Sequence, residues 1–374
     1  MNFNKVLRKN LVNIPGWRTR RKIVVIESDD WGSIRMPSRD VYELLLSKGV
    51  PVDKHYFLKN DCLESEHDLA ALFEVLSSFK DINGNCPVIT ANAVVANPDF
   101  EKIAASGMQK YFYEPITETY KRYPNHTKSF EIWKNEGVGN RLLWPQFHGR
   151  EHLNVRKWME AVNSADPWEL AGFENNVLLG IERGNKNNRK SNYMAAFGYS
   201  ELSEWGELNK IVQEGLSIFE KLFGFPSRSF VAPCSIRGDH LDPALLNGGI
   251  LYHQCGQQYI PSQSGSLKIK NRLWGQQNRL GQVYWRRNAT FEPTRNPDFD
   301  WVNSCLAEIN IAFRWGKPAV INSHRVNYIG GIFTENKENT LRLLGNLCHE
   351  IMVNWPNTEF MTSDQLGDTI INNR

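Results

Sequence analysis

The strongest constraint on the fold is a set of short apolar runs that alternate with amphipathic segments. The apolar runs cover residues 22–28, 86–95, 142–148, 228–234, 282–287, 317–324 and 358–363. The segments 65–81, 155–163, 207–224, 299–316 and 336–355 place apolar residues at helical spacing. Strands that alternate with helices predict βα units around a mainly parallel sheet. About seven such units predict a closed or nearly closed α/β barrel, whose functional side chains lie at the carboxyl ends of the strands.

Four of the apolar runs end directly in polar clusters, which read "ESDD", "QFHGREH", "APCS" and "INSHR". Long segments near 32–86, 99–140 and 172–200 are predicted to be insertions that shape a substrate cleft. Within the last of these, the Asn-rich stretch 183–192 predicts an exposed loop. With no clear linker, we expect one barrel domain over 22–374, preceded by a basic segment over 1–21.

Composition excludes several classes of protein. The 374 residues are 41% hydrophobic and carry a net charge of +3, a balance that does not indicate a nucleic-acid partner. The basic start lacks the apolar core of a secretory signal, and no run is apolar enough to span a membrane, which predicts a cytoplasmic protein. A peripheral membrane contact by this start, which bears Trp17, is the weaker alternative. The six cysteines form no CxxC pair, which predicts reduced thiols.

Asp29 and Asp30 end the first apolar run as adjacent carboxylates. Two like charges this close repel each other, and burial would raise the cost further. Either a bound cation neutralises one of them, or both lie in water.

His148 and His152 form an HxxxH pattern at the second polar end. On a helix, residues i and i+4 share one face, so both imidazoles would be able to bind one metal. The alternative is that both are ordinary histidines. The pattern is not HExxH, so it lacks the glutamate of that protease motif. Taken singly, Cys234 is predicted to be a buried thiol and not a nucleophile, and His324 a structural histidine.

Taken in chain order, the polar ends resemble the motifs of the NodB-type polysaccharide deacetylases, carbohydrate esterase family 4. The matching stretches are "SDDWG", "HGREH", "FVAPCS" and "AVINSH", followed by "TEFMTSDQL" at the last strand. The resemblance is that of a divergent member, and it implies a distorted (β/α)7-type barrel with long loop insertions. The family has Gly directly after the Asp pair, where this chain has Trp31.

The resemblance assigns one divalent metal to Asp30, His148 and His152. Zinc is the first choice, and cobalt, nickel, manganese and iron are the alternatives. The resemblance further implies that Asp29 is the general base and His324 the general acid.

Other family positions differ in this chain. Val231 occupies the position of the family's motif-three Arg, and Cys234 that of the following aromatic. Arg228 or Arg237 is the candidate substitute for that Arg. The candidates for the fourth motif, which steadies the base, are Trp285, Arg286, Arg287 and Glu292. The residues expected to contact substrate are Trp31 and Pro233, which lie in the matched stretches, and Arg237, which lies just beyond one of them.

The implied activity is hydrolysis of a carbon–nitrogen amide bond: removal of an N-acetyl, or O-acetyl, group from an acetylated saccharide. One alternative is a non-catalytic, sugar-binding relative of the same fold, which the missing motif-three Arg favours. The other is an amidohydrolase of the same superfamily that acts on a non-sugar amide.

Overall fold

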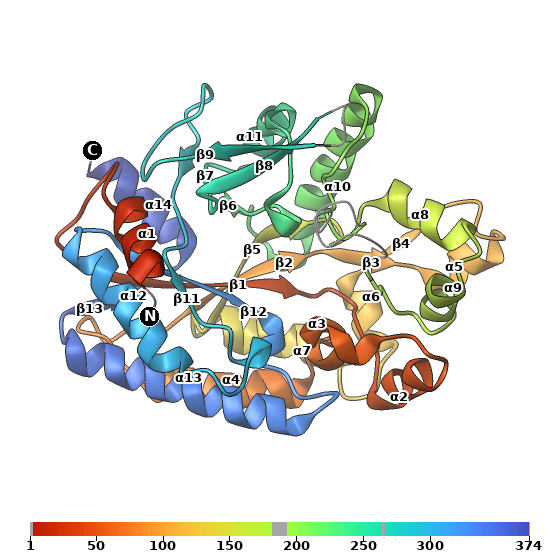
Figure 1. The fold of residues 1–374 in the computed structure, drawn as a ribbon, viewed down its shortest axis with the longest axis horizontal. Helices are drawn as coiled ribbons and strands as arrows, with labels where there is room; N and C mark the ends of the chain where they lie inside the picture. Colours follow the sequence, from red (N-terminus) through yellow and green to blue (C-terminus); the bar gives the residue numbers. More distant parts are fainter. Residues whose placement is uncertain (1–2, 182–192, 263–265, 374) are drawn as a thin grey trace.

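One parallel sheet forms the centre of the computed structural model, which describes residues 3–181, 193–262 and 266–373. The sheet has nine strands in the order β10-β7-β6-β5-β2-β1-β12-β11, with β13 beside the start of β1. Every pairing in it is parallel. The sheet curls into an incomplete barrel, open between β10 and β11 (Figure 1). This confirms the prediction of a nearly closed α/β barrel.

All seven apolar runs contribute a strand to this sheet. These strands are β1 (Lys22–Trp31), β2 (Ile89–Val94), β5 (Leu143–Gly149), β6 (Ser229–Phe230), β10 (Val283–Tyr284), β12 (Ala319–His324) and β13 (Thr358–Phe360). Two further strands, β7 (Tyr252–His253) and β11 (Ala289–Thr290), were not predicted. They are too short to show a periodic pattern in the sequence.

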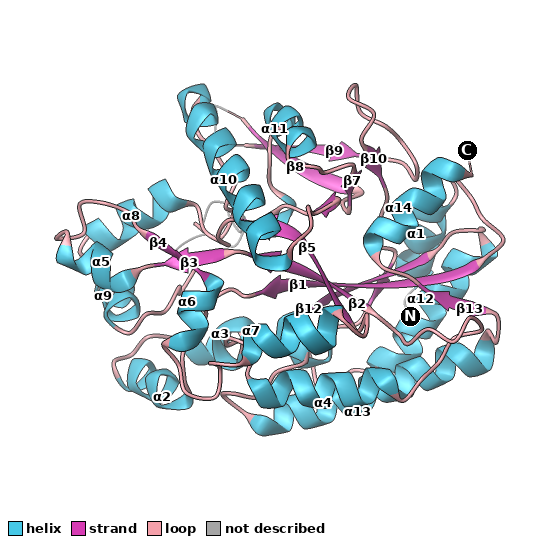
Figure 2. Cartoon of the chain, turned by 180° about the vertical axis from the view of Figure 1, so that it is seen from behind, coloured by secondary structure: helices cyan, strands magenta, loops and turns pink. Residues whose placement is uncertain are grey.

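Helices surround the curled sheet, with α4, α7 and α13 along one side of the molecule and α10 and α11 along the opposite side (Figures 1 and 2). The five predicted amphipathic segments form α4 (Glu66–Ser77), α8 (Val155–Asn163), α10 (Trp205–Phe223), α12 (Trp301–Arg314) and α13 (Thr334–Asn354). The remaining helices are α1 (Phe3–Asn13), α2 (Arg39–Ser47), α3 (Tyr56–Asn60), α5 (Phe100–Ala105), α6 (Ile116–Lys121), α7 (Ser129–Ile132), α9 (Pro167–Glu174), α11 (Asp242–Asn247) and α14 (Ser363–Asn372). None of the helices in the described ranges is long and apolar enough to cross a membrane.

Two antiparallel hairpins supplement the main sheet. One pairs β3 (Ala96–Pro98) with β4 (Tyr113–Pro115), and the other pairs β8 (Gln257–Pro261) with β9 (Leu267–Asn271). The predicted insertion over 32–86 contains α2, α3 and α4, and that over 99–140 contains α5, α6 and α7. The predicted exposed loop over 183–192 lies outside the described residues. The division into a basic segment and one domain stays a prediction.

β1 occupies the centre of the sheet and carries the Asp pair at its carboxyl end. Its apolar residues Ile23 to Ile26 are at most 1% exposed. β12 pairs with β1 in a register that sets His324 opposite Asp29. Two of the polar ends therefore become neighbours because adjacent parallel strands end at the same edge of the sheet.

Candidate metal centre

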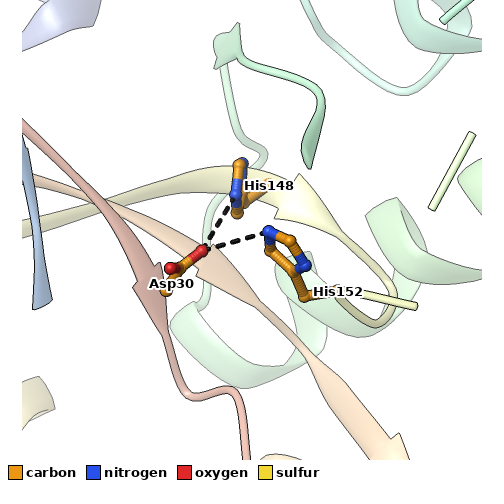
Figure 3. A group of neighbouring side chains, drawn as sticks. All are labelled: Asp30, His148 and His152. Atoms are coloured by element: carbon orange, nitrogen blue, oxygen red, sulfur yellow. Dashed lines mark ion pairs between the residues drawn. The ribbon is translucent and has the colours of Figure 1, made fainter. Parts of the chain in front are cut away.

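Asp30, His148 and His152 form a compact buried cluster at this edge (Figure 3). The Nε2 atoms of His148 and His152 lie 3.5 and 3.2 Å from Oδ1 of Asp30. The three ligand atoms all lie within 4.8 Å of one another. The structure therefore gathers the three residues assigned to a metal from two strand ends, β1 and β5.

The two histidines do not share a helix, so the helical interpretation of HxxxH is wrong. His148 lies in β5, and His152 follows in an irregular turn before α8. Gly149 has φ +141°, a left-handed value that favours glycine, and an added Cβ would lie 2.9 Å from the carbonyl oxygen of Glu151. This turn, and not a helix face, brings His152 back toward His148.

The donor set of the cluster fits a divalent cation. Nδ1 of His148 donates to the carbonyl of Val231 at 2.8 Å, so in the neutral ring Nε2 presents its lone pair. That buried Nε2 has no hydrogen-bond partner in the described part of the chain and faces the Asp30 carboxylate. Two acceptors facing each other are stabilised by a cation between them. Two imidazoles and one carboxylate are a familiar open zinc set, although the same ligands suit several other metals.

The backbone of β1 is irregular where it carries the Asp pair. Its register against β2 shifts between Ser28 and Trp31, and Asp30 has φ +78°. A regular strand would send adjacent side chains to opposite faces, whereas a bulge re-aims them. Burial opposes ionisation of Asp30, but the neighbouring imidazoles of His152 and His148 outweigh it and hold the pKa of Asp30 well below the usual value.

Arg287 holds the neighbouring Asp29. Its Nη1 and Nη2 donate to Oδ2 and Oδ1 of Asp29, both at 2.7 Å, and its Nε donates to Glu27 at 2.6 Å. Asn92 donates to Oδ1 at 2.8 Å. Burial works against ionisation, but Arg287 outweighs it and lowers the pKa of Asp29. Asp29 is therefore an ionised acceptor at neutral pH.

His324 lies beside Asp29 with the opposite electrostatics. Its Nε2 is 4.0 Å from Oδ2 of Asp29, and its Nδ1 donates to Oε1 of Glu292 at 2.6 Å. Burial disfavours the imidazolium, but Glu292 outweighs burial and raises the pKa of His324 to about 10. The site thus places a proton acceptor next to a proton donor.

Three of the four candidates for the fourth motif form hydrogen bonds with residues of the site, and one does not. Trp285 donates to Glu27 at 2.8 Å, Arg287 binds Asp29 and Glu292 binds His324. Arg286 instead donates to the carbonyl of Arg272. These residues lie in or just beyond the segment 285–288, which joins the two edge strands across the opening of the barrel.

Glu64 connects the turn after the Asp pair with the residue that follows His324 at the end of β12. It is fully buried, accepts from the backbone N–H of Gly32 at 3.0 Å and accepts from Arg325 at 2.8 Å. Arg325, which directly follows His324, also donates to Asp61 at 3.1 Å. Arg35 adds ion pairs of 3.8 Å with Asp30 and 3.6 Å with Asp61. Breaking such a buried charge network by removing one member is strongly destabilising.

The expected substrate contacts are placed differently. Trp31 is 1% exposed and packs against Trp133 and Tyr328, so we assign it to core packing and not to substrate contact. Arg237 is buried in an ion pair with Asp242, and no contact joins it to Asp29 in the described structure. The guanidinium that does contact Asp29 belongs to Arg287. Pro233 is buried just after β6, close to the Val231 carbonyl that binds His148.

Cys234 is exposed, contrary to the prediction of a buried thiol. It has φ +55° and Ser235 has φ +57°, so the chain turns sharply outward after Pro233. None of the six cysteines forms a disulfide.

Five residues that contact the site or its immediate partners were not predicted from the sequence. These are Phe57, Glu64, Asn92, Gln254 and Arg325. Asn92 interrupts an apolar strand, which is a signal that would have found it. Phe57 on α3 is partly exposed, and its ring lies edge-on to His324 with the centroids 5.2 Å apart. It therefore forms one wall beside the proton donor.

No family model and no curated protein matches the sequence. Among solved structures, a putative polysaccharide deacetylase from Mycobacterium smegmatis is 12% identical with a TM-score of 0.43, over 96% of this chain and 93% of that one. Puue allantoinase is 11% identical with a TM-score of 0.47, over 95% and 93%. A 4-alpha-glucanotransferase from Thermococcus litoralis is 9% identical with a TM-score of 0.44, over 93% and 40%. Likenesses this distant, to proteins of different activities, do not assign an activity to this chain.

Proposed function

We propose that this chain is a metal-dependent hydrolase that removes an acetyl group from the nitrogen, or from an oxygen, of a saccharide. The observation that carries the proposal is the metal-type cluster of Asp30, His148 and His152 beside the oppositely charged pair of Asp29 and His324. The order of the sequence motifs supports an acetylated saccharide as the substrate.

Each polar group has a distinct role in this reaction. A divalent cation bound by Asp30, His148 and His152 would polarise the acetyl carbonyl and lower the pKa of a water molecule. Asp29, oriented by Arg287 and Asn92, accepts a proton from the attacking water. His324, oriented by Glu292, donates a proton from Nε2 to the departing amine.

The saccharide would lie against Phe57. This side chain is partly exposed next to His324 and offers an apolar ring beside the group that protonates the leaving amine.

Metal analysis combined with acetate release tests the proposal. The wild-type protein is expected to bind about one zinc ion per chain, as three protein ligands leave an open catalytic site, and to release acetate from acetylated oligosaccharides. Asp30→Asn is expected to lose metal, because a neutral amide is a poorer ligand. Asp29→Asn is expected to keep the metal and lose about 10²- to 10⁴-fold in turnover. Asp298→Asn, at an exposed position, is the matched control and should change neither quantity.

Each contrary result has a defined meaning. If no transition metal is present and none is taken up from added zinc, the metal assignment is wrong. If metal falls in Asp29→Asn and not in Asp30→Asn, the two roles are exchanged. Acetate release that is absent, or unchanged in both variants, would refute the deacetylase assignment.

A further inference from the structure

Helix α1 exposes its leucines and turns several polar residues inward. Leu7 and Leu11 lie at positions i and i+4, which share one face of the helix, and Ile14 directly follows the helix. These three side chains are 48%, 56% and 37% exposed. Helices on the surface of a soluble domain place such a stripe toward the core. Here the stripe faces outward instead.

The opposite face of α1 is polar and fastened to the barrel. Asn13 is fully buried and accepts from Asn288 at 2.8 Å. Asn10 accepts from Trp315 at 2.8 Å, and Lys9 pairs with Glu308 at 3.1 Å. These contacts fix the rotation of the helix, so the exposure of the leucines follows from specific hydrogen bonds.

Positive charge is concentrated in the same part of the chain. The first 22 residues contain seven Lys and Arg and no Asp or Glu, so the rest of the chain has a net charge of −4 against +3 for the whole. Arg8, Arg18 and Arg20 are exposed. Arg18 donates to the carbonyl of Ile14 at 2.9 Å, which sets a guanidinium at the end of the apolar stripe.

We propose that this face, formed by Leu7, Leu11, Ile14, Arg8, Arg18 and Arg20, binds the surface of an anionic phospholipid membrane. The arginines complement the negative headgroups, and the three apolar side chains enter the boundary between headgroups and acyl chains. A nucleic acid would match the charge but would leave the apolar stripe in water.

The surface lies at the opposite end of the barrel from the metal centre. α1 contacts Asn288, and the segment after α1 binds Lys317, just before β12 starts. Figure 1 shows α1 near the start of β1, whereas Asp29 and Asp30 lie at its far end. A ten-residue strand spans roughly 30 Å. Membrane binding is therefore expected to leave the catalytic end in the aqueous phase.

Vesicle sedimentation of the full-length protein tests the proposal. Vesicles of phosphatidylcholine are compared with vesicles that also contain phosphatidylglycerol. Three exposed cations, each contributing about fivefold, are expected to raise the partition coefficient about 100-fold on the anionic vesicles. Raising the salt from about 0.1 M to about 1 M shortens the Debye length from about 10 Å to about 3 Å and should remove most of this gain.

Paired substitutions separate the two components of binding. Arg8→Gln with Arg18→Gln should weaken binding to anionic vesicles about 25-fold. Leu7→Gln with Leu11→Gln should weaken it at least about tenfold. Ile82→Gln and Leu202→Gln, at positions 62% and 50% exposed on other elements, are the controls and should bind as wild type. Because all these side chains are exposed, the thermal midpoint should not change.

Three results would overturn the proposal. The first is wild-type protein that sediments with neither kind of vesicle. The second is a leucine pair variant that binds vesicles as tightly as wild type. The third is equally tight binding to duplex DNA that survives the leucine substitutions, which would identify a general polyanion surface. Acetate release without vesicles should be the same in all these variants, so this test is independent of the proposed catalytic function.

Discussion

Replacing Arg287 by Met should strongly destabilise the protein, because one guanidinium compensates two buried carboxylates. Asp29 and Glu27 accept hydrogen bonds of 2.6 to 2.7 Å from Arg287, and Glu27 is fully buried. Removing one partner of a buried ion pair typically costs about 3–5 kcal/mol. Because Asn92 still donates to Asp29, and Trp285 to Glu27, we expect about 4 kcal/mol for Arg287→Met.

Urea unfolding followed by circular dichroism measures this loss. The matched control is Arg286→Met, since the neighbouring side chain donates only to the carbonyl of Arg272 in the described structure. The control should cost about 1 kcal/mol or less. In a double-mutant cycle, Glu27→Gln combined with Arg287→Met should show a coupling energy of about 1–3 kcal/mol, because Gln leaves no buried charge to compensate.

The reasoning would be refuted if Arg287→Met cost no more than Arg286→Met. It would also be refuted if the double-mutant cycle showed no coupling, because Glu27 would then not depend on Arg287 for its compensation. The folded fraction of Arg287→Met should lose turnover as well, since Asp29 would no longer be held in place by Arg287.

Three further substitutions test other parts of the site. Glu292→Gln removes the charge that raises the pKa of His324 to about 10. Since the protonated imidazole is the active form, the alkaline limb of the pH profile of kcat should move about 1–3 pH units toward acid. A limb that does not move would contradict the role of His324 as the acid. Gly32 has φ +76°, and an added Cβ would lie 2.9 Å from the Val94 carbonyl oxygen, so Gly32→Ala should lower the free energy of urea unfolding by about 2 kcal/mol. Gly84→Ala, at φ +80° with open space around the added Cβ, is the control and should lower it by about 1 kcal/mol. Phe57→Ala should raise KM for an acetylated oligosaccharide about threefold to tenfold and leave KM for a small acetyl ester unchanged; an equal rise for both would argue against sugar stacking.

The sequence by itself determined the order of the main elements. Each of the seven apolar runs forms a strand, and each of the five amphipathic segments forms a helix. These patterns are readable because a strand of a parallel sheet is buried on both faces and forms a continuous apolar run, whereas the apolar residues of a surface helix recur about every 3.6 positions. The sequence also predicted the candidate site residues, because they lie in the polar clusters at the ends of apolar runs. These residues are Asp29, Asp30, His148, His152 and His324.

Only the tertiary structure decided how those residues meet. A turn at the end of β5, and not a helix, aims His152 toward His148 and Asp30. Trp31 follows the Asp pair yet packs in the core. The two-residue strands β7 and β11 exist through their pairing partners and have no periodic pattern of their own.

The structure also decided which arginine holds the base. Arg228, Arg237, Arg286 and Arg287 were all open candidates in the sequence, and only Arg287 contacts Asp29. The two residues are 258 positions apart. A local pattern reports which face of its own element is buried, whereas a contact between distant side chains depends on strand order and register. The same limit applies to α1, whose outward leucines follow from hydrogen bonds to Asn288 and Trp315 on distant segments of the chain.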